Sequence, residues 1–196
     1  PNTIHDILKK RGYYIFKNMI PKDKIDIAKQ YIVDDKVNIF RLTKQFIEPY
    51  IIKEVGIQID RNIINTKSRI SNNNNSSDAG AFHRDIHNYS KYKTTRIYTI
   101  LTYIDGGNME IIPGTNNKRS MSIIDALNTF SDRIDNVLEP GDVLMFDATT
   151  IHRGIFYKKQ KHRRLIQLFD CVFDYDYDYY LRTILHVPCR NDCSTN

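Results

Sequence analysis

The sequence changes in character near residue 80, and no other feature restricts the possible fold as much. Upstream of this point, apolar residues recur at helical spacing in 21–32 and 40–55. Downstream, short runs rich in β-branched and aromatic residues alternate with turn sequences, as in 94–104, which ends at Asp105-Gly106-Gly107. Helices followed by many short strands predict a mainly β chain of the α+β class, in which N-terminal helices buttress a sandwich or barrel.

The chain has 196 residues, which suits one domain with a core of ordinary size. We expect a helical buttress and the first strands over residues 1–70, a β core over 80–175, and a C-terminal extension over 176–196. The asparagine run in 71–77 predicts a loop between the first two parts. In 173–180 tyrosines alternate with aspartates. This pattern fits a half-buried strand or tail better than a platform for stacking bases, because aspartates repel phosphates.

Charge and cysteine content exclude several classes of protein. Charged residues make up 27% and hydrophobic residues 41% of the chain, as is typical of a soluble globular protein. The net charge of +6 is densest in 158–164, where a solvated hairpin is a better explanation than a nucleic-acid surface. Three cysteines support neither a disulfide framework nor a zinc quartet. The opening segment has no signal-peptide core and no run could span a membrane, so we expect a cytoplasmic protein.

A metal site is predicted from His83, Asp85 and His152. If the segment around His83 is extended, His83 and Asp85 point to the same side, and a neighbouring strand could bring His152 opposite them. Two imidazoles and one carboxylate can occupy one face of an octahedral metal and leave the other face open for a co-substrate and dioxygen, as in non-haem Fe(II) oxygenases. Arg163 follows His152 by eleven positions and offers a planar cation suited to a carboxylate such as that of 2-oxoglutarate.

Two other interpretations of the same residues fail on their context. His83-Arg84-Asp85 copies the catalytic tripeptide of protein kinases, but the chain lacks the glycine-rich loop and the Asp-Phe-Gly element. His83 and His87 have the spacing of a helical zinc site, yet no glutamate follows His83, and Gly80 with the asparagine run does not favour a helix.

The chain resembles the phytanoyl-CoA dioxygenase family of Fe(II)/2-oxoglutarate-dependent oxygenases, and four stretches carry this resemblance. They are the opening Gly-Tyr strand in 11–20, the His-x-Asp motif in 82–85, the strand that ends in Pro-Gly in 108–116, and the closing motif from Gly141 through His152 to Arg163. Together they span residues 10 to 173.

This resemblance implies a double-stranded β-helix core, the jelly-roll or cupin-like fold. It implies that His83, Asp85 and His152 bind Fe(II), and that Arg163 binds the distal carboxylate of 2-oxoglutarate. With O2 as oxidant, the expected reaction is hydroxylation of a C–H bond in a small-molecule or lipid-like substrate, with release of succinate and CO2. Related halogenating enzymes lack the carboxylate ligand, so the presence of Asp85 favours hydroxylation.

The sequence departs from the family pattern at two places. Gly154 stands where the family often has a serine that touches the co-substrate, and Leu101 and Thr102 stand where an aromatic residue often walls it. Thr102 is a candidate for a hydroxyl group beside Arg163. Arg163 is followed by Arg164, and in a regular strand the two side chains must point to opposite sides. The family-like spacing from His152 selects Arg163 as the residue that binds 2-oxoglutarate.

Two alternative functions stay open at this stage. One is a cupin-like metal or ligand-binding module that has lost turnover. Gly154 favours this alternative, whereas the intact triad of His83, Asp85 and His152 argues against it. The other is a nucleic-acid demethylase, which the arginine spacing and the lack of a second spaced arginine make the poorest of the three. The loops at 71–79 and 115–135 should set specificity, but no sequence code gives the substrate or the oligomeric state.

Overall fold

The computed structural model describes residues 3–31, 45–46, 48–55, 63–71, 80–85, 97–155 and 164–172. Its helices are α1 (Ile4–Arg11), α2 (Lys22–Tyr31), α4 (Glu48–Val55), α6 (Ile123–Thr129) and the short 3-10 helix η1 (Thr115–Asn117). Its strands are β1 (Tyr13–Phe16), β2 (Ile63–Ser71), β3 (Ile97–Tyr103), β4 (Gly107–Ile111), β5 (Ile134–Leu138), β6 (Val143–Asp147), β7 (His152–Ile155) and β8 (Arg164–Val172). None of the helices in these ranges has the length and apolar character needed to cross a bilayer.

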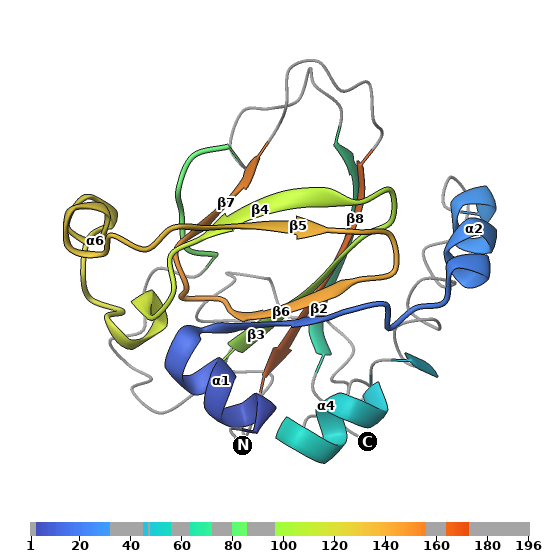
Figure 1. Cartoon of the computed structure of the whole chain (residues 1–196), viewed down its shortest axis with the longest axis horizontal. Helices are drawn as coiled ribbons and strands as arrows, with labels where there is room; N and C mark the ends of the chain where they lie inside the picture. Colours follow the sequence, from blue (N-terminus) through green and yellow to red (C-terminus); the bar gives the residue numbers. More distant parts are fainter. Residues whose placement is uncertain are drawn as a thin grey trace, which may run out of the picture.

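The strands form two antiparallel sheets. The first sheet has the order β1-β6-β3-β8-β2, and the second has the order β5-β4-β7. An isolated antiparallel bridge between His83 and His152 adds the segment around His83 to the second sheet, beside β7. In Figure 1, α1 and α4 lie together along one side of the strands, while α2 and α6 lie at opposite ends. The chain is therefore of the α+β class, with antiparallel sheets and helices around them.

The main core lies between the two sheets. The first sheet contributes Tyr13, Leu101, Tyr103, Leu144 and Phe146, and the second contributes Met109, Ile111 and Leu138. Alternation along β3 sends Tyr98, Ile100 and Thr102 to the other face of the first sheet, where they are also buried. Both faces of this sheet are therefore covered, which explains why β6 begins with four apolar residues in a row and is buried along its whole length.

The turn before β6 fastens the N-terminal segment to the sheet. The buried Asp142 carboxylate accepts hydrogen bonds from the backbone N–H of Asn18 at 2.9 Å and of Glu139 at 3.0 Å. The same carboxylate lies 2.6 Å from the Lys17 ammonium group. Gly141 adopts φ 99°, and its carbonyl accepts from the backbone N–H of Ile20. These contacts give the Gly-Asp pair before β6 a structural role.

Two edge strands, β2 and β5, were not expected from the sequence. The strands before residue 80 are β1 and β2, which lie in the part of the chain where the first strands were expected. Both strands mix apolar with polar residues and lie at an edge of their sheet, where one side of the strand pairs with no other described strand that would favour an apolar run. The expected helices at 21–32 and 40–55 correspond to α2 and, within the described residues, to α4. The alternating segment 173–180 and the extension 176–196 lie outside the described residues.

We expect Gly141→Ala to destabilise the protein more than Gly114→Ala. The φ angles of these glycines are 99° and 81°, so an alanine at either position costs roughly 1–2 kcal/mol in backbone strain. At Gly141 an added Cβ would also lie 2.5 Å from the carbonyl oxygen of Ile20, whereas at Gly114 the nearest atom, in Phe130, is 3.7 Å away. Urea denaturation of both variants measures the difference. Equal losses would show that the backbone near Ile20 moves aside freely.

Candidate metal centre

His83, Asp85 and His152 converge on one point at the edge of the core. Reciprocal backbone hydrogen bonds of 3.0 Å join His83 and His152, so the two residues face each other across an antiparallel bridge. Asp85 follows two positions after His83, and its Oδ1 lies 3.4 Å from Nε2 of each histidine. The three ligand atoms all lie within 4.8 Å of one another. The structure therefore brings together the three residues that the sequence predicted as metal ligands.

The backbone fixes the tautomer of both histidines. Nδ1 of His83 lies 2.8 Å from the carbonyl oxygen of Ala81, and Nδ1 of His152 lies 2.9 Å from that of Thr150. A carbonyl oxygen can only accept, so each Nδ1 carries the proton and donates it. When a ring is neutral, its Nε2 is therefore the unprotonated nitrogen, and this atom lies on the side of Asp85. This arrangement supplies the orienting partners that a metal-binding histidine needs.

The centre is deep on one side and open on the other. The His152 side chain is 4% exposed and its ring packs against Phe146, with the ring centroids 4.6 Å apart. The side chains of His83 and Asp85 are 31% and 32% exposed. Burial works to raise the pKa of Asp85, but the imidazoles of His152 and His83, when both are protonated in the metal-free site, lower it further through their positive charge and the hydrogen bonds they donate, so its net pKa lies well below the usual range. The carboxylate is thus ionised at neutral pH.

This donor set fits a divalent transition metal. Two neutral imidazole nitrogens and one anionic oxygen point toward a common position, which is the arrangement that fills one face of an octahedron. Imidazole is a good ligand for iron, nickel and copper, and a single carboxylate adds the negative charge. Three protein ligands leave coordination positions for other molecules, so the site suits binding and catalysis better than a closed structural role.

Arg84 is a structural residue of the site that sequence reasoning missed. It lies between His83 and Asp85, points to the opposite side, and is 4% exposed. Its guanidinium donates to the carbonyl oxygens of Thr115 and Lys118 at 3.0 Å, to that of Met121 at 3.2 Å, and to that of Thr149. Arg84 therefore ties the segment that carries two ligands to the 115–121 loop and to the segment that precedes His152. Its position next to the two ligands was the only signal in the sequence.

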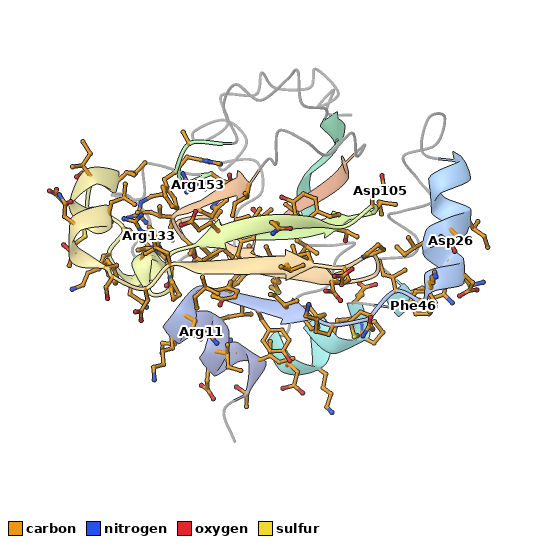
Figure 2. All side chains as sticks on the ribbon, turned by 45° about the horizontal axis from the view of Figure 1, so that its top comes forward. Arg11, Asp26, Phe46, Asp105, Arg133 and Arg153 are labelled. Carbon is orange, nitrogen blue, oxygen red and sulfur yellow. The ribbon has the colours of Figure 1, made fainter. Side chains whose placement is uncertain are left out.

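Phe82, which precedes His83, is anchored as well. The Arg153 guanidinium lies over the Phe82 ring at 4.3 Å and pairs with Glu110 at 2.6 Å. Glu110 and Arg153 are paired across β4 and β7, so they share the outer face of the second sheet. Figure 2 shows Arg153 near Arg133, at the end of the sheets where α6 lies. Both neighbours of His83 are thus held on the side away from the metal centre.

The backbone before His152 is fixed by the N-terminal region. The Thr150 hydroxyl donates to the carbonyl oxygen of Gly12 at 3.1 Å, and the backbone N–H of Ile151 donates to the Thr115 hydroxyl at 2.9 Å. Gly12 adopts φ 84°, and a Cβ there would lie 2.5 Å from the Thr150 hydroxyl oxygen. Thr115 belongs to the Pro-Gly-Thr-Asn stretch noted in the sequence, so that stretch and the Gly-Tyr strand both support the position of His152.

Three further residues were considered from the sequence: Arg163, Gly154 and Thr102. Arg163 lies outside the described residues, and β8 begins at Arg164. Gly154 lies two positions after His152 on β7 and pairs with Met109. Thr102 is fully buried on the face of β3 opposite Thr99 and Leu101, and its hydroxyl has no hydrogen-bond partner among the residues that the structure describes. Because the centre lies on the Thr99 side, this placement argues against a contact between Thr102 and a co-substrate.

Comparison with known proteins gives structural but not sequence relatives. No family model matches the chain, and no curated sequence matches it.

The epimerase SnoN, solved in complex with Fe3+, alpha ketoglutarate and nogalamycin RO, is 11% identical, with a TM-score of 0.64 over 97% of this chain and 90% of SnoN. The alpha ketoglutarate dependent carbocyclase SnoK from nogalamycin biosynthesis is 9% identical, with a TM-score of 0.64 over 87% of this chain and 86% of its own. HygX from Streptomyces hygroscopicus, with nickel and 2-oxoglutarate bound, is 12% identical, with a TM-score of 0.58 over 84% and 83%. The chain shares the fold of these proteins.

We expect Arg84→Met to lower the free energy of unfolding by about 3 kcal/mol. Methionine keeps the apolar stem but removes a charged donor from four carbonyl groups. The control is Arg133→Met, since Arg133 is exposed, has a backbone hydrogen bond at 3.5 Å and lies 5.8 Å from the centre of the Phe82 ring, and its change should stay within about 1 kcal/mol. Thermal or urea unfolding measures both variants. Similar losses for the two would contradict the anchoring role of Arg84.

Proposed function

We propose that this chain is an Fe(II)- and 2-oxoglutarate-dependent dioxygenase that hydroxylates a C–H bond of a small-molecule or lipid-like substrate, releasing succinate and CO2. The observation that carries the proposal is the convergence of Nε2 of His83, Nε2 of His152 and Oδ1 of Asp85. The shared fold with SnoN, SnoK and HygX supports it, because the structures of SnoN and HygX hold a metal and the same co-substrate.

The order of the strands supports a double-stranded β-helix as the core. Along the chain, β2, β3, β6 and β8 belong to the first sheet, while the His83 segment, β4, β5 and β7 belong to the second. Eight segments that cross between two facing antiparallel sheets in this way form a jelly roll. The His83 segment takes the second place in this order and β7 the seventh, so the fold brings ligands that are distant in sequence to one end of the second sheet.

Each residue of the centre has a distinct task in the proposed reaction. His83 and His152 present fixed Nε2 lone pairs, and Asp85 adds the single negative charge. When bound, Fe(II) with 2-oxoglutarate and O2 supplies the oxidising power that a C–H bond requires. The deep side at His152 and Phe146 excludes water, while the exposed side at His83 and Asp85 gives access to the substrate.

We propose Arg163 as the group that binds the distal carboxylate of 2-oxoglutarate, with Arg164 as its competitor. The spacing of eleven residues after His152 favours Arg163. The strand register instead favours position 164. Positions 166, 168 and 170 of β8 pair with Tyr103, Leu101 and Thr99 of β3, and position 164 is the next one in this alternating series. A regular β8 thus puts position 164 in phase with the face that carries Thr99.

The first prediction from this proposal concerns the anionic ligand. We expect Asp85→Ala to weaken Fe(II) binding by more than about 100-fold. Removing a residue that only hydrogen-bonds to a metal ligand already costs up to about 100-fold in affinity, so removing the ligand itself should cost more. Succinate formation from 2-oxoglutarate should fall to the level of His152→Ala. Asp132→Ala, at an exposed aspartate, is the matched control and should behave like the wild type. Wild-type protein that binds the metal but forms no metal-dependent succinate with any candidate substrate would favour a cupin-like binding module instead.

The second prediction separates the adjacent arginines. Removal of the bidentate contact to a carboxylate should cost on the order of 2–4 kcal/mol, so Arg163→Ala should raise the KM for 2-oxoglutarate by tens- to hundreds-fold. Arg164→Ala should change this KM little. Steady-state kinetics at saturating Fe(II) measures both. The opposite ranking would assign the contact to Arg164 and would make the register of β8 a better guide than the spacing from His152.

A further inference from the structure

We infer that Thr99 is a positioning residue that restricts Asp85 to one metal-binding oxygen, Oδ1, by holding the other, Oδ2. The inference rests on the proposed metal centre and goes beyond it by assigning the coordination mode of the carboxylate. It also identifies a residue whose hydroxyl acts on the metal through another side chain.

The two oxygens of Asp85 have different partners. Oδ1 lies 3.4 Å from Nε2 of both His83 and His152, so it faces the position where the three ligands converge. Oδ2 accepts a hydrogen bond from the Thr99 hydroxyl at 3.2 Å. A carboxylate that binds a metal through both oxygens would need Oδ2 to leave Thr99. The contact therefore favours binding through Oδ1 alone.

Thr99 is well placed to keep this contact. It lies in the middle of β3 and is 1% exposed, so its side chain has little room to rotate. Its neighbours across the sheet include Phe146 of β6, whose ring packs against His152. A β-branched residue has a restricted χ1 angle, which also limits the directions of the hydroxyl. A strand of the first sheet thus holds a candidate ligand from the segment that bridges to the second sheet.

The consequence for the site is the number of open coordination positions. With two imidazoles and one carboxylate oxygen, three positions of an octahedron stay free, which suits a chelating co-substrate and one more molecule. A carboxylate bound through both oxygens would occupy one of those positions. The Thr99 hydroxyl would therefore protect the capacity of the centre to bind two partners at once.

The test is a Co(II) titration of the metal-free protein, followed by the visible absorption of bound Co(II), which responds to coordination number and geometry. Thr99→Val removes the hydroxyl and keeps the shape of the side chain, and Thr99→Ser keeps the hydroxyl. We expect the valine variant to bind Co(II) roughly 10- to 100-fold more weakly and to show an altered spectrum, as for other partners of metal ligands. The serine variant should stay close to the wild type.

Thr102→Val is the matched control, because Thr102 is a buried threonine on the same strand that faces away from the centre. It should leave Co(II) affinity and spectrum unchanged. If circular dichroism shows that the valine variant is unfolded, Thr99→Ala and Thr99→Ser replace it. These two variants also differ by the hydroxyl alone, so the difference in their Co(II) affinity and spectrum measures the effect of the hydroxyl.

Three outcomes would overturn the inference. Wild-type affinity and spectrum in the valine variant would show that the hydroxyl does not position Asp85. Equal losses in the serine and valine variants would attribute the effect to packing of the strand. No Co(II) binding by the wild type would remove the proposed function together with the inference, whereas the first two results leave the metal centre in place.

Discussion

The candidate site depends on a single antiparallel bridge between His83 and His152. The bridge consists of two backbone hydrogen bonds, and it joins a segment without further strand pairing among the described residues to the edge of a regular sheet. Direct opposition across an antiparallel bridge places two side chains on the same side and close together. Alternation then brings Asp85 to that side as well. The backbone thus brings the three side chains to the same side, and the side-chain conformations then complete the geometry of the triad.

A bridge of two hydrogen bonds is weak by itself, and the surrounding residues compensate for this. Arg84 and Phe82 flank His83, and both are anchored on the side away from the metal, the first by carbonyl groups and the second by the Arg153 guanidinium. On the partner segment, Gly12 and Thr115 hold the residues before His152. Arg84, Gly12 and Thr115 are buried and take part in hydrogen bonds to the backbone, so they fix position without contributing a competing ligand. A functional centre of this kind needs such support because its own ligands are charged or polar and partly desolvated.

The sequence predicted the ligand set and the general class of the fold, and the reasons are physical. His83 and Asp85 share a side in any extended segment, and the short apolar run before His152 is typical of an inner strand. The edge strands β2 and β5 were missed because their mixed polar composition carries no clear period. Arg84 was missed because a charged residue is normally exposed, and only the folded loop at 115–121 shows which carbonyl groups it meets. The pairing of Thr99 with Asp85 joins two different sheets, which no local pattern could reveal.

The uneven burial of the three ligands has a consequence for how the site is filled and emptied. His83 and Asp85 face solvent while His152 lies inside, so an incoming hydrated cation meets the carboxylate and one imidazole first and reaches the inner imidazole last. In the proposed centre, loss of an ion would follow the reverse order and would need no rearrangement of the sheets, since the two histidines remain joined through their main chains. A chelator would then remove the ion from the folded protein, and a different divalent cation would be able to take its place. The occupant is then decided by the relative supply of the available metals as well as by the ligands themselves.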